Sequence, residues 1–244
     1  MRPLQDKKDL KTWFILERPA LLDALTKQVQ DRRFILVDAP RGGGKTVCLR
    51  HFYRHYFSSR HAFLHTAAIR YDFSTIQTGS PALPGALHRR LKHEVGRRGF
   101  DWGEVPWVPA PTLSSNQGTS ALADLCAALI DEGLSLGFIF DHVDFSSPAF
   151  PQFINLVISL PNTWILLAVD EAAAIPAPLS SSHASFLIPR LTSAEALAIL
   201  ERTCVSHGLN PSREELHRMV MDAHGHPLTL YEIFFKRLSQ LHSV

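Results

Sequence analysis

Short apolar runs alternate with amphipathic segments along the first three quarters of the chain. Runs of this kind, bounded by turn-forming residues, predict buried strands at 34–37, 62–67, 136–140 and 163–169, with a shorter fifth strand at 185–188. Apolar residues at helical spacing predict helices at 20–30, 47–57, 85–97, 121–132 and 149–160. Because strands that alternate with helices are typical of a parallel sheet covered on both faces, we expect an α/β three-layer sandwich with a mainly parallel five-stranded sheet.

The last quarter of the chain has only the helical period. Thr192 and Glu195 fit a capping box, as do Ser212 and Glu215, and a third helix is expected to begin at Pro227. We therefore predict a large domain at 1–188 and a small helical subdomain at 189–244. Prolines and glycines interrupt residues 71–118, which predicts an irregular insertion within the large domain.

A glycine-rich turn follows the first strand and precedes a helix. Residues 39–46, Ala-Pro-Arg-Gly-Gly-Gly-Lys-Thr, fit the pattern small-x-x-x-x-Gly-Lys-Ser/Thr of a phosphate-binding loop. Glycines let the backbone wrap an anion with its N–H groups inward, and the following helix adds the positive end of its dipole. We expect Lys45 to bridge the β- and γ-phosphates of a nucleotide and the Thr46 hydroxyl to bind Mg²⁺. The predicted nucleotide-binding residues are Pro40, Arg41, Gly42, Gly43, Gly44, Lys45, Thr46 and Val47, and the alternative is an ordinary glycine-rich turn.

An acid closes the strand predicted at 136–140. Asp141 has the position needed to hold Mg²⁺ opposite a phosphate-binding loop, although many buried strands end at an Asp that only caps the next turn. Parallel strands present their carboxyl ends at one edge of a sheet, so Lys45 and Asp141 are expected to converge there. These two residues are catalytic candidates, and Asp144 is the third.

Composition narrows the class of protein only modestly. The formal charge of +2 by itself does not indicate a nucleic-acid surface. The three cysteines lie far apart without metal-ligand spacing, which favours a reduced, cytoplasmic protein. No apolar run approaches the roughly 18 residues needed to span a bilayer, so no membrane partner is expected.

The order of these motifs resembles the STAND branch of the AAA+ ATPases, the signal-transduction ATPases with numerous domains. The nucleotide-binding domain of the large ATP-dependent LuxR-type transcriptional activators is similar, and so are the archaeal-type ATPases. The matching segments are a hydrophobic-Arg segment at 15–18, the loop at 39–46, Asp141, a linker at 186–196, and Gly-His-Pro at 225–227.

This resemblance implies ATP or ADP with Mg²⁺ as ligand. The adenine would pack on Pro227, with Ile15 and Leu16 on its other side, and Arg18 and His226 belong to the same predicted site. Arg18 is expected to support the following helix or to touch the nucleotide, and His226 to cap a helix or pack near the base. The resemblance further implies a switch in which nucleotide state sets the helical subdomain, self-association and contacts with protein partners.

Two departures from the family pattern concern hydrolysis. His142 stands where the family usually carries a second acid, and Asp170 with Glu171 stands where the activators carry a Ser-Arg pair. Because such groups activate the attacking water and stabilise charge, their loss predicts hydrolysis slower by several powers of ten.

Two other functions fit parts of the sequence. A basic cluster could contact DNA phosphates in an AAA+ helper of the initiator or transposition type, or it could be a solvated helix face. Its residues are Arg89, Arg90, Lys92, Arg97 and Arg98. A small-molecule kinase is the third interpretation, with Asp72 as the only acid near the second strand.

Overall fold

The computed structural model describes residues 18–58, 66–72, 83–97, 115–143, 145, 149–169, 179 and 183–241. These residues form two compact units. The sheet unit contains residues 20–38 and the described residues between 48 and 187, and the helical unit contains residues 18–19, 39–47 and 188–241. The glycine-rich loop therefore groups with the C-terminal helices, and the predicted domain boundary at 188 stays a prediction.

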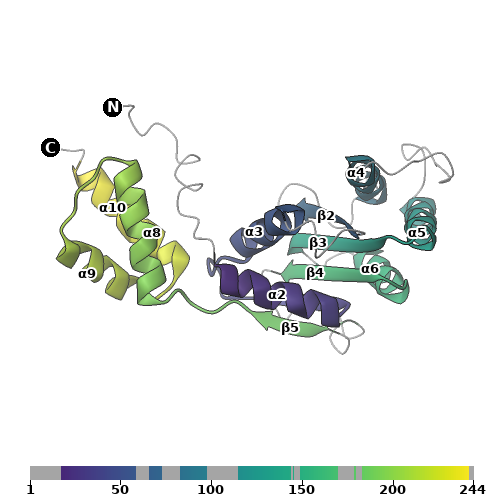
Figure 1. Cartoon of the computed structure of the whole chain (residues 1–244), viewed down its shortest axis with the longest axis horizontal. Helices are drawn as coiled ribbons and strands as arrows, with labels where there is room; N and C mark the ends of the chain where they lie inside the picture. Colours follow the sequence, from purple (N-terminus) through teal and green to yellow (C-terminus); the bar gives the residue numbers. More distant parts are fainter. Residues whose placement is uncertain are drawn as a thin grey trace. The chain divides into compact units, whose positions relative to one another are not determined.

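A parallel five-stranded sheet forms the centre of the sheet unit (Figure 1). Its strands are β1 (Phe34–Asp38), β2 (Thr66–Asp72), β3 (Ser135–Val143), β4 (Thr163–Val169) and β5 (Ala184–Leu187), in the order β2-β3-β4-β1-β5. Each neighbouring pair is parallel, which confirms the α/β fold predicted from the sequence. The carboxyl ends of all five strands therefore lie at one edge of the sheet, and among the described residues β2 and β5 are its outermost strands.

Helices cover both faces of this sheet. They are α2 (Pro19–Asp31), α3 (Lys45–Ser58), α4 (Leu83–Arg97), α5 (Ser115–Asp131) and α6 (Ala149–Ser159). On one face, Phe138 of β3 packs edge-on against Phe153 of α6, in a core that α4 and α5 share. On the other face, Phe52 of α3 meets Trp164 of β4 edge-on, with ring centroids 6.1 Å apart. None of the described helices has the length and apolar character needed to cross a membrane.

Two predicted boundaries differ from the structure. The second strand was expected at 62–67, but β2 spans Thr66–Asp72 and carries the charged Arg70 within it. The strand accommodates Arg70 because its guanidinium pairs with Asp141 of β3, and an apolar run therefore underestimates the length of the strand. The helix expected at 121–132 begins earlier, at Ser115, in a polar stretch that gives no periodic signal. Residues 71–118 are thus not irregular throughout, and 73–82 and 98–114 lie outside the described residues.

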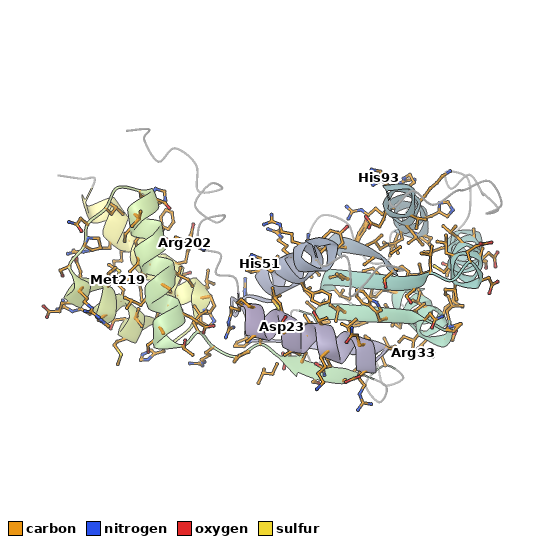
Figure 2. The ribbon with its side chains drawn as sticks, in the orientation of Figure 1. Asp23, Arg33, His51, His93, Arg202 and Met219 are labelled. Carbon is orange, nitrogen blue, oxygen red and sulfur yellow. The ribbon has the colours of Figure 1, made fainter. Side chains whose placement is uncertain are left out.

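The helical unit contains α8 (Ser193–Ser206), α9 (Arg213–Ala223) and α10 (Pro227–Leu241). Thr192 and Glu195 form the predicted capping box at α8, since each side chain bonds the backbone N–H of the other residue. Ser212 caps α9, since its hydroxyl oxygen accepts a hydrogen bond from the backbone N–H of Glu215. The apolar faces of α8, α9 and α10 share one core, to which Met219 of α9 belongs (Figure 2). This bundle is the scaffold for the contacts with the glycine-rich loop.

Candidate functional site

The loop at 39–46 has the backbone conformation that its glycines were expected to permit. Gly42 and Gly44 have φ angles of 76° and 95°, in the left-handed region that other residues avoid. A Cβ on Gly43 would lie 2.8 Å from the Pro40 carbonyl oxygen, which accepts a hydrogen bond from the Gly43 N–H. The close turn therefore depends on the absence of side chains, as a cradle for an anion requires.

Lys45 closes this turn. Its ammonium nitrogen Nζ donates a hydrogen bond of 2.7 Å to the carbonyl oxygen of Ala39, the first residue of the loop. Lys45 and Thr46 are the first residues of α3, so their backbone N–H groups belong to the helix N-terminus. A phosphate in the cradle would offer the lysine a stronger, charged partner than a neutral carbonyl.

The first turn of α10 lies directly on the loop. A Cβ added to Gly42 would come within 2.7 Å of both Cβ and Cδ2 of Leu228, and a Cβ on Gly44 would lie 4.0 Å from Cγ of Pro227. Pro227 occupies the first position of the helix, where its missing N–H costs nothing. The predicted residues Gly42, Gly44 and Pro227 are thus brought together within one unit.

His226 joins the loop to α10 through both nitrogens of its ring. Its Nε2 lies 2.9 Å from the carbonyl oxygen of Arg41, and its Nδ1 accepts from the backbone N–H of Thr229 at 3.3 Å. Because Nδ1 acts as acceptor, the proton of the neutral ring belongs on Nε2, which then donates to Arg41. The side chain therefore caps α10 and ties it to the loop backbone.

Arg18 holds the segment that leads into α8. Its Nε lies 2.7 Å from Oε1 of Glu195, and its terminal nitrogens donate to the carbonyl oxygens of Pro189 and Arg190. Burial alone would raise the pKa of Glu195, but hydrogen bonds from the Thr192 N–H and Arg18 and the charge of Arg18 bring it below its ordinary value. Support of local structure is thus the visible role of Arg18, and its contact with nucleotide stays a prediction.

Asp141 lies at the carboxyl end of β3 in the sheet unit. Its side chain is only 2 % exposed, and Oδ2 accepts a hydrogen bond of 3.0 Å from the guanidinium of Arg70 on β2. The register pairs Arg70 with Ile139, and side chains alternate along a strand, so Arg70 and Asp141 share a face of the sheet. By the same alternation this is the face of Trp164, against which α3 packs.

A bulge re-aims the chain immediately after Asp141. His142 has a φ of 54°, and the register between β3 and β4 shifts between Phe140 and Val143. The backbone N–H of His142 donates to Oδ1 of Asp141 at 3.1 Å, and its Nδ1 lies 3.5 Å from the same oxygen. A non-glycine residue in this conformation costs energy and is often found near functional sites.

Several predicted site residues lie outside the described part of the chain. These are Ile15, Leu16 and Asp144, together with Arg98 of the basic cluster and the Asp170–Glu171 pair. Sequence reasoning in turn missed Leu228 and Arg70. Leu228 follows the Gly-His-Pro motif directly, and Arg70 interrupts an otherwise apolar run before the predicted insertion, so both carried a weak signal.

No family model and no curated protein matches the sequence, whereas its structure matches many solved ones. A Walker-type ATPase of Pyrococcus abyssi is similar over 93 % of this chain and 67 % of its own, with a TM-score of 0.62 and 17 % identity. A DNA replication initiation factor has a TM-score of 0.54 at 15 % identity, over 97 % of this chain and 66 % of its own. The Aeropyrum pernix ORC2 protein, solved in ADPNP and ADP complexes, has a TM-score of 0.50 at 18 % identity, over 76 % and 50 %.

The chain therefore spans one half to two thirds of the length of these three structures. With sequence identities below 20 %, the structural similarity shows a shared architecture only. Any activity of this chain has to be argued from its own residues. Its parallel sheet, its glycine-rich loop after β1 and these neighbours together show that the chain has an α/β fold of the P-loop NTPase type, similar to that of a Walker-type ATPase.

Proposed function

We propose that this protein binds an adenine nucleotide with Mg²⁺ at the loop 39–46 and that the bound nucleotide sets the position of α10. The observation that carries the proposal is the contact between the first turn of α10 and the loop, through Leu228 on Gly42 and His226 on the Arg41 carbonyl. A phosphate that reshapes the loop backbone must change these contacts. Nucleotide state is thereby converted into a preference between arrangements of the helical unit.

The residues present fit this ligand. At Gly42 and Gly43 an added Cβ would collide with neighbouring atoms, so the close turn needs glycine, and Lys45 stands at its end on a helix N-terminus. Thr46 and Asp141 would hold Mg²⁺, since hydroxyl and carboxylate oxygens are its ordinary ligands. Bound Mg²⁺ would neutralise phosphate charge. The Arg70 guanidinium would then have to share the Asp141 carboxylate with the metal ion.

Adenine recognition by Pro227, with Ile15 and Leu16, belongs to the same proposal. Pro227 lies near Gly44, so a base extending from the loop toward α10 would reach its ring. Slow hydrolysis is also proposed, because the position after Asp141 holds a histidine in a bulge instead of an acid. Lys45 and Asp141 are the catalytic candidates, and Asp144 is the acid that could orient water.

Two measurements test the proposal. Denaturing the purified protein and separating the released small molecules by chromatography should recover ADP or ATP. Amide hydrogen exchange at 226–230 should then differ between samples saturated with ADP and with a non-hydrolysable ATP analogue, because the Arg41 carbonyl moves with the loop.

Two outcomes would contradict the switch. Equal exchange at α10 in both nucleotide states, with nucleotide shown to be bound, would mean that α10 does not sense the phosphates. Loss of binding in Leu228→Ala but not in Lys45→Ala would mean that the loop is not the phosphate site. Lys92→Ala, which removes a cation on α4 in the sheet unit, is the matched control for charge.

A helper acting on DNA is the second candidate, supported by the exposed Arg89 and Arg90 on α4. Phosphate contacts release counterions, so retention of DNA should fall steeply between two salt concentrations. Substitution of both arginines by alanine should abolish retention if this candidate holds, and leave nucleotide-dependent exchange at α10 unchanged.

A further inference from the structure

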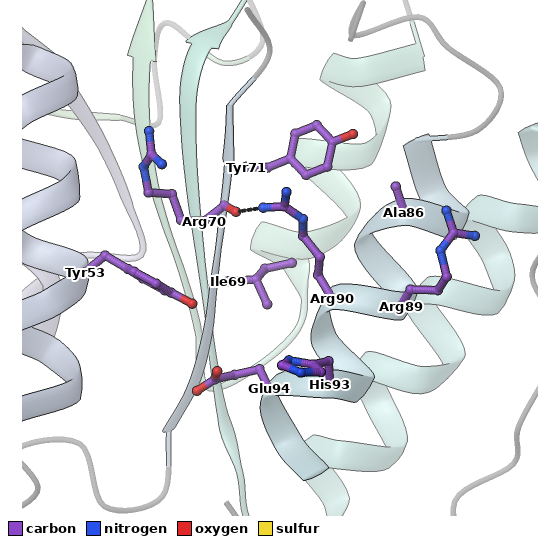
Figure 3. A pocket seen from close by; sticks show the side chains of 9 residues that line it. All are labelled: Tyr53, Ile69, Arg70, Tyr71, Ala86, Arg89, Arg90, His93 and Glu94. Atoms are coloured by element: carbon purple, nitrogen blue, oxygen red, sulfur yellow. Dashed lines mark hydrogen bonds between the residues drawn. The ribbon is translucent and has the colours of Figure 1, made fainter. Parts of the chain in front are cut away.

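A cavity of about 510 Å³ lies beside the edge strand β2 in the sheet unit (Figure 3). Its walls come from β2, from α3 and from α4. The residues used below are Tyr53, Arg70, Tyr71, Arg89, Arg90 and Glu94. A cavity of this size suits a small molecule, since typical ligand sites measure about 300 to 1,000 Å³.

One side of the cavity is strongly cationic. Arg90 is fixed in place because its guanidinium stacks on Tyr71, 4.7 Å from the ring centroid, and donates to the Arg70 carbonyl oxygen. Arg89 is exposed, and Figure 3 shows its side chain at the same wall as Ala86. Burial, together with the charges of Lys92 and Arg89, lowers the pKa of the neighbouring His88. Guanidinium groups present paired N–H donors, which match the oxygens of a phosphate.

The other side of the cavity offers hydrogen-bond acceptors. Glu94 lines it, and Figure 3 shows its carboxylate away from the Arg90 guanidinium and reaching toward Tyr53. An anion alone would be repelled by Glu94, whereas a molecule with an anionic end and a hydroxylated end would satisfy both walls.

We propose that this cavity binds a small phosphorylated molecule with a hydroxyl-bearing body, its phosphate on Arg89 and Arg90 and its hydroxyls toward Glu94. The guanidinium groups supply charge-assisted donors, and the carboxylate accepts from the hydroxyls. A nucleic-acid strand also carries phosphates, but it needs an extended groove, and its backbone phosphates would be repelled by the Glu94 carboxylate.

Arg70 connects this cavity to Asp141 at the carboxyl end of β3. Its carbonyl oxygen accepts from Arg90 at the cavity, while its side chain donates to Asp141 at 3.0 Å. A phosphate that draws Arg90 away from this carbonyl oxygen lets β2 shift at Arg70 and so loosens the bond to Asp141. On the proposed function, on which this step rests, the ligand would thereby prepare Asp141 for Mg²⁺, and the coupling is reciprocal.

The binding test uses Lys45→Ala as background, so that the loop at 39–46 cannot account for any signal. Ribose 5-phosphate, inorganic phosphate and a single-stranded oligonucleotide are titrated in turn by calorimetry. We expect ribose 5-phosphate to bind, and Arg89→Ala in that background to weaken it about 10-fold or more, because it removes a charged donor. Lys92→Ala, a neighbouring cation of α4 outside the lining, should leave the affinity unchanged.

Three outcomes would overturn the proposal. These are absence of binding by ribose 5-phosphate, equal weakening by Lys92→Ala, and preference for the oligonucleotide with the same dependence on Arg89, which would assign the surface to nucleic acid. All three are independent of the loop, so they leave the proposed nucleotide switch standing.

The coupling through Arg70 has its own test. Asp141→Asn removes the charge that holds Arg70, so the affinity for ribose 5-phosphate should rise about 5-fold or more. Circular dichroism establishes that the variant is folded. Unchanged affinity in a folded variant would overturn the coupling. The binding site itself would still be tested by Arg89→Ala.

Discussion

Substitution of Gly42 by alanine probes the contact between the loop and α10. The new Cβ meets two obstacles, a φ of 76° that alanine disfavours and the side chain of Leu228 at 2.7 Å. The left-handed backbone costs about 1 to 2 kcal/mol. Gly133→Ala is a matched control, because its φ is 85° and no atom lies within 4 Å of the added Cβ.

The collision with Leu228 adds a second cost. If α10 moves away to relieve it, the protein loses the buried part of that side chain, which is 42 % exposed and therefore 58 % covered. Full burial of a leucine contributes about 1.5 to 3 kcal/mol, so this loss is about 1 to 1.7 kcal/mol. We expect Gly42→Ala to be less stable than Gly133→Ala by about this amount.

Denaturant unfolding without nucleotide measures both variants. Leu228→Gly should lower the free energy of unfolding less in the Gly42→Ala background than in the wild type, because the Leu228 contact with the loop is already lost there. A double-mutant cycle gives the coupling energy. If Gly42→Ala costs no more than Gly133→Ala and the cycle shows no coupling, the first turn of α10 does not lie on the loop.

Three further predictions concern the same unit. Lys45→Ala should abolish the thermal shift of about 5 to 10 °C expected for a protein of this size at a nucleotide concentration of 100 Kd, while Lys92→Ala keeps it; an unchanged shift would contradict the assigned loop. His226→Ala should cost about 1 kcal/mol in denaturant unfolding by removing the bond to Arg41, and a loss indistinguishable from zero would refute that bond. Because the pKa of Glu195 is lowered in the folded state, its contribution is present above its unfolded pKa of about 4.3 and is lost as pH falls through the folded pKa. Glu195→Gln should therefore lose less than about 1 kcal/mol near pH 7 and flatten the acid limb of the stability curve, whereas parallel curves would show that Arg18 does not stabilise the carboxylate.

The sheet and the loop could be predicted from the sequence because both depend on local patterns. Continuous apolar runs such as 163–169 are long enough to be recognised alone, and the glycine-lysine-threonine pattern determines its own backbone. The capping box of Thr192 and Glu195 is equally local, and the structure reproduces it.

The pair between Arg70 and Asp141 could not be predicted, because it depends on register. The two residues are 71 positions apart and meet only because β2 lies beside β3 with Arg70 opposite Ile139. The strand predicted at 62–67 ends before Arg70, so the sequence analysis left this residue outside the sheet. The contact of Leu228 with Gly42 has the same origin, since no local pattern identifies which helix covers a loop.

The loop at 39–46 is also part of the covalent path between the two units. The chain passes from one unit to the other at four points, after residues 19, 38, 47 and 187, and the loop lies between the second and third of them. Arg18 ties the segments at the first and fourth points to each other through its bonds to Pro189 and Arg190. A ligand that stiffens the loop would therefore act on the chain at two of these four points at once.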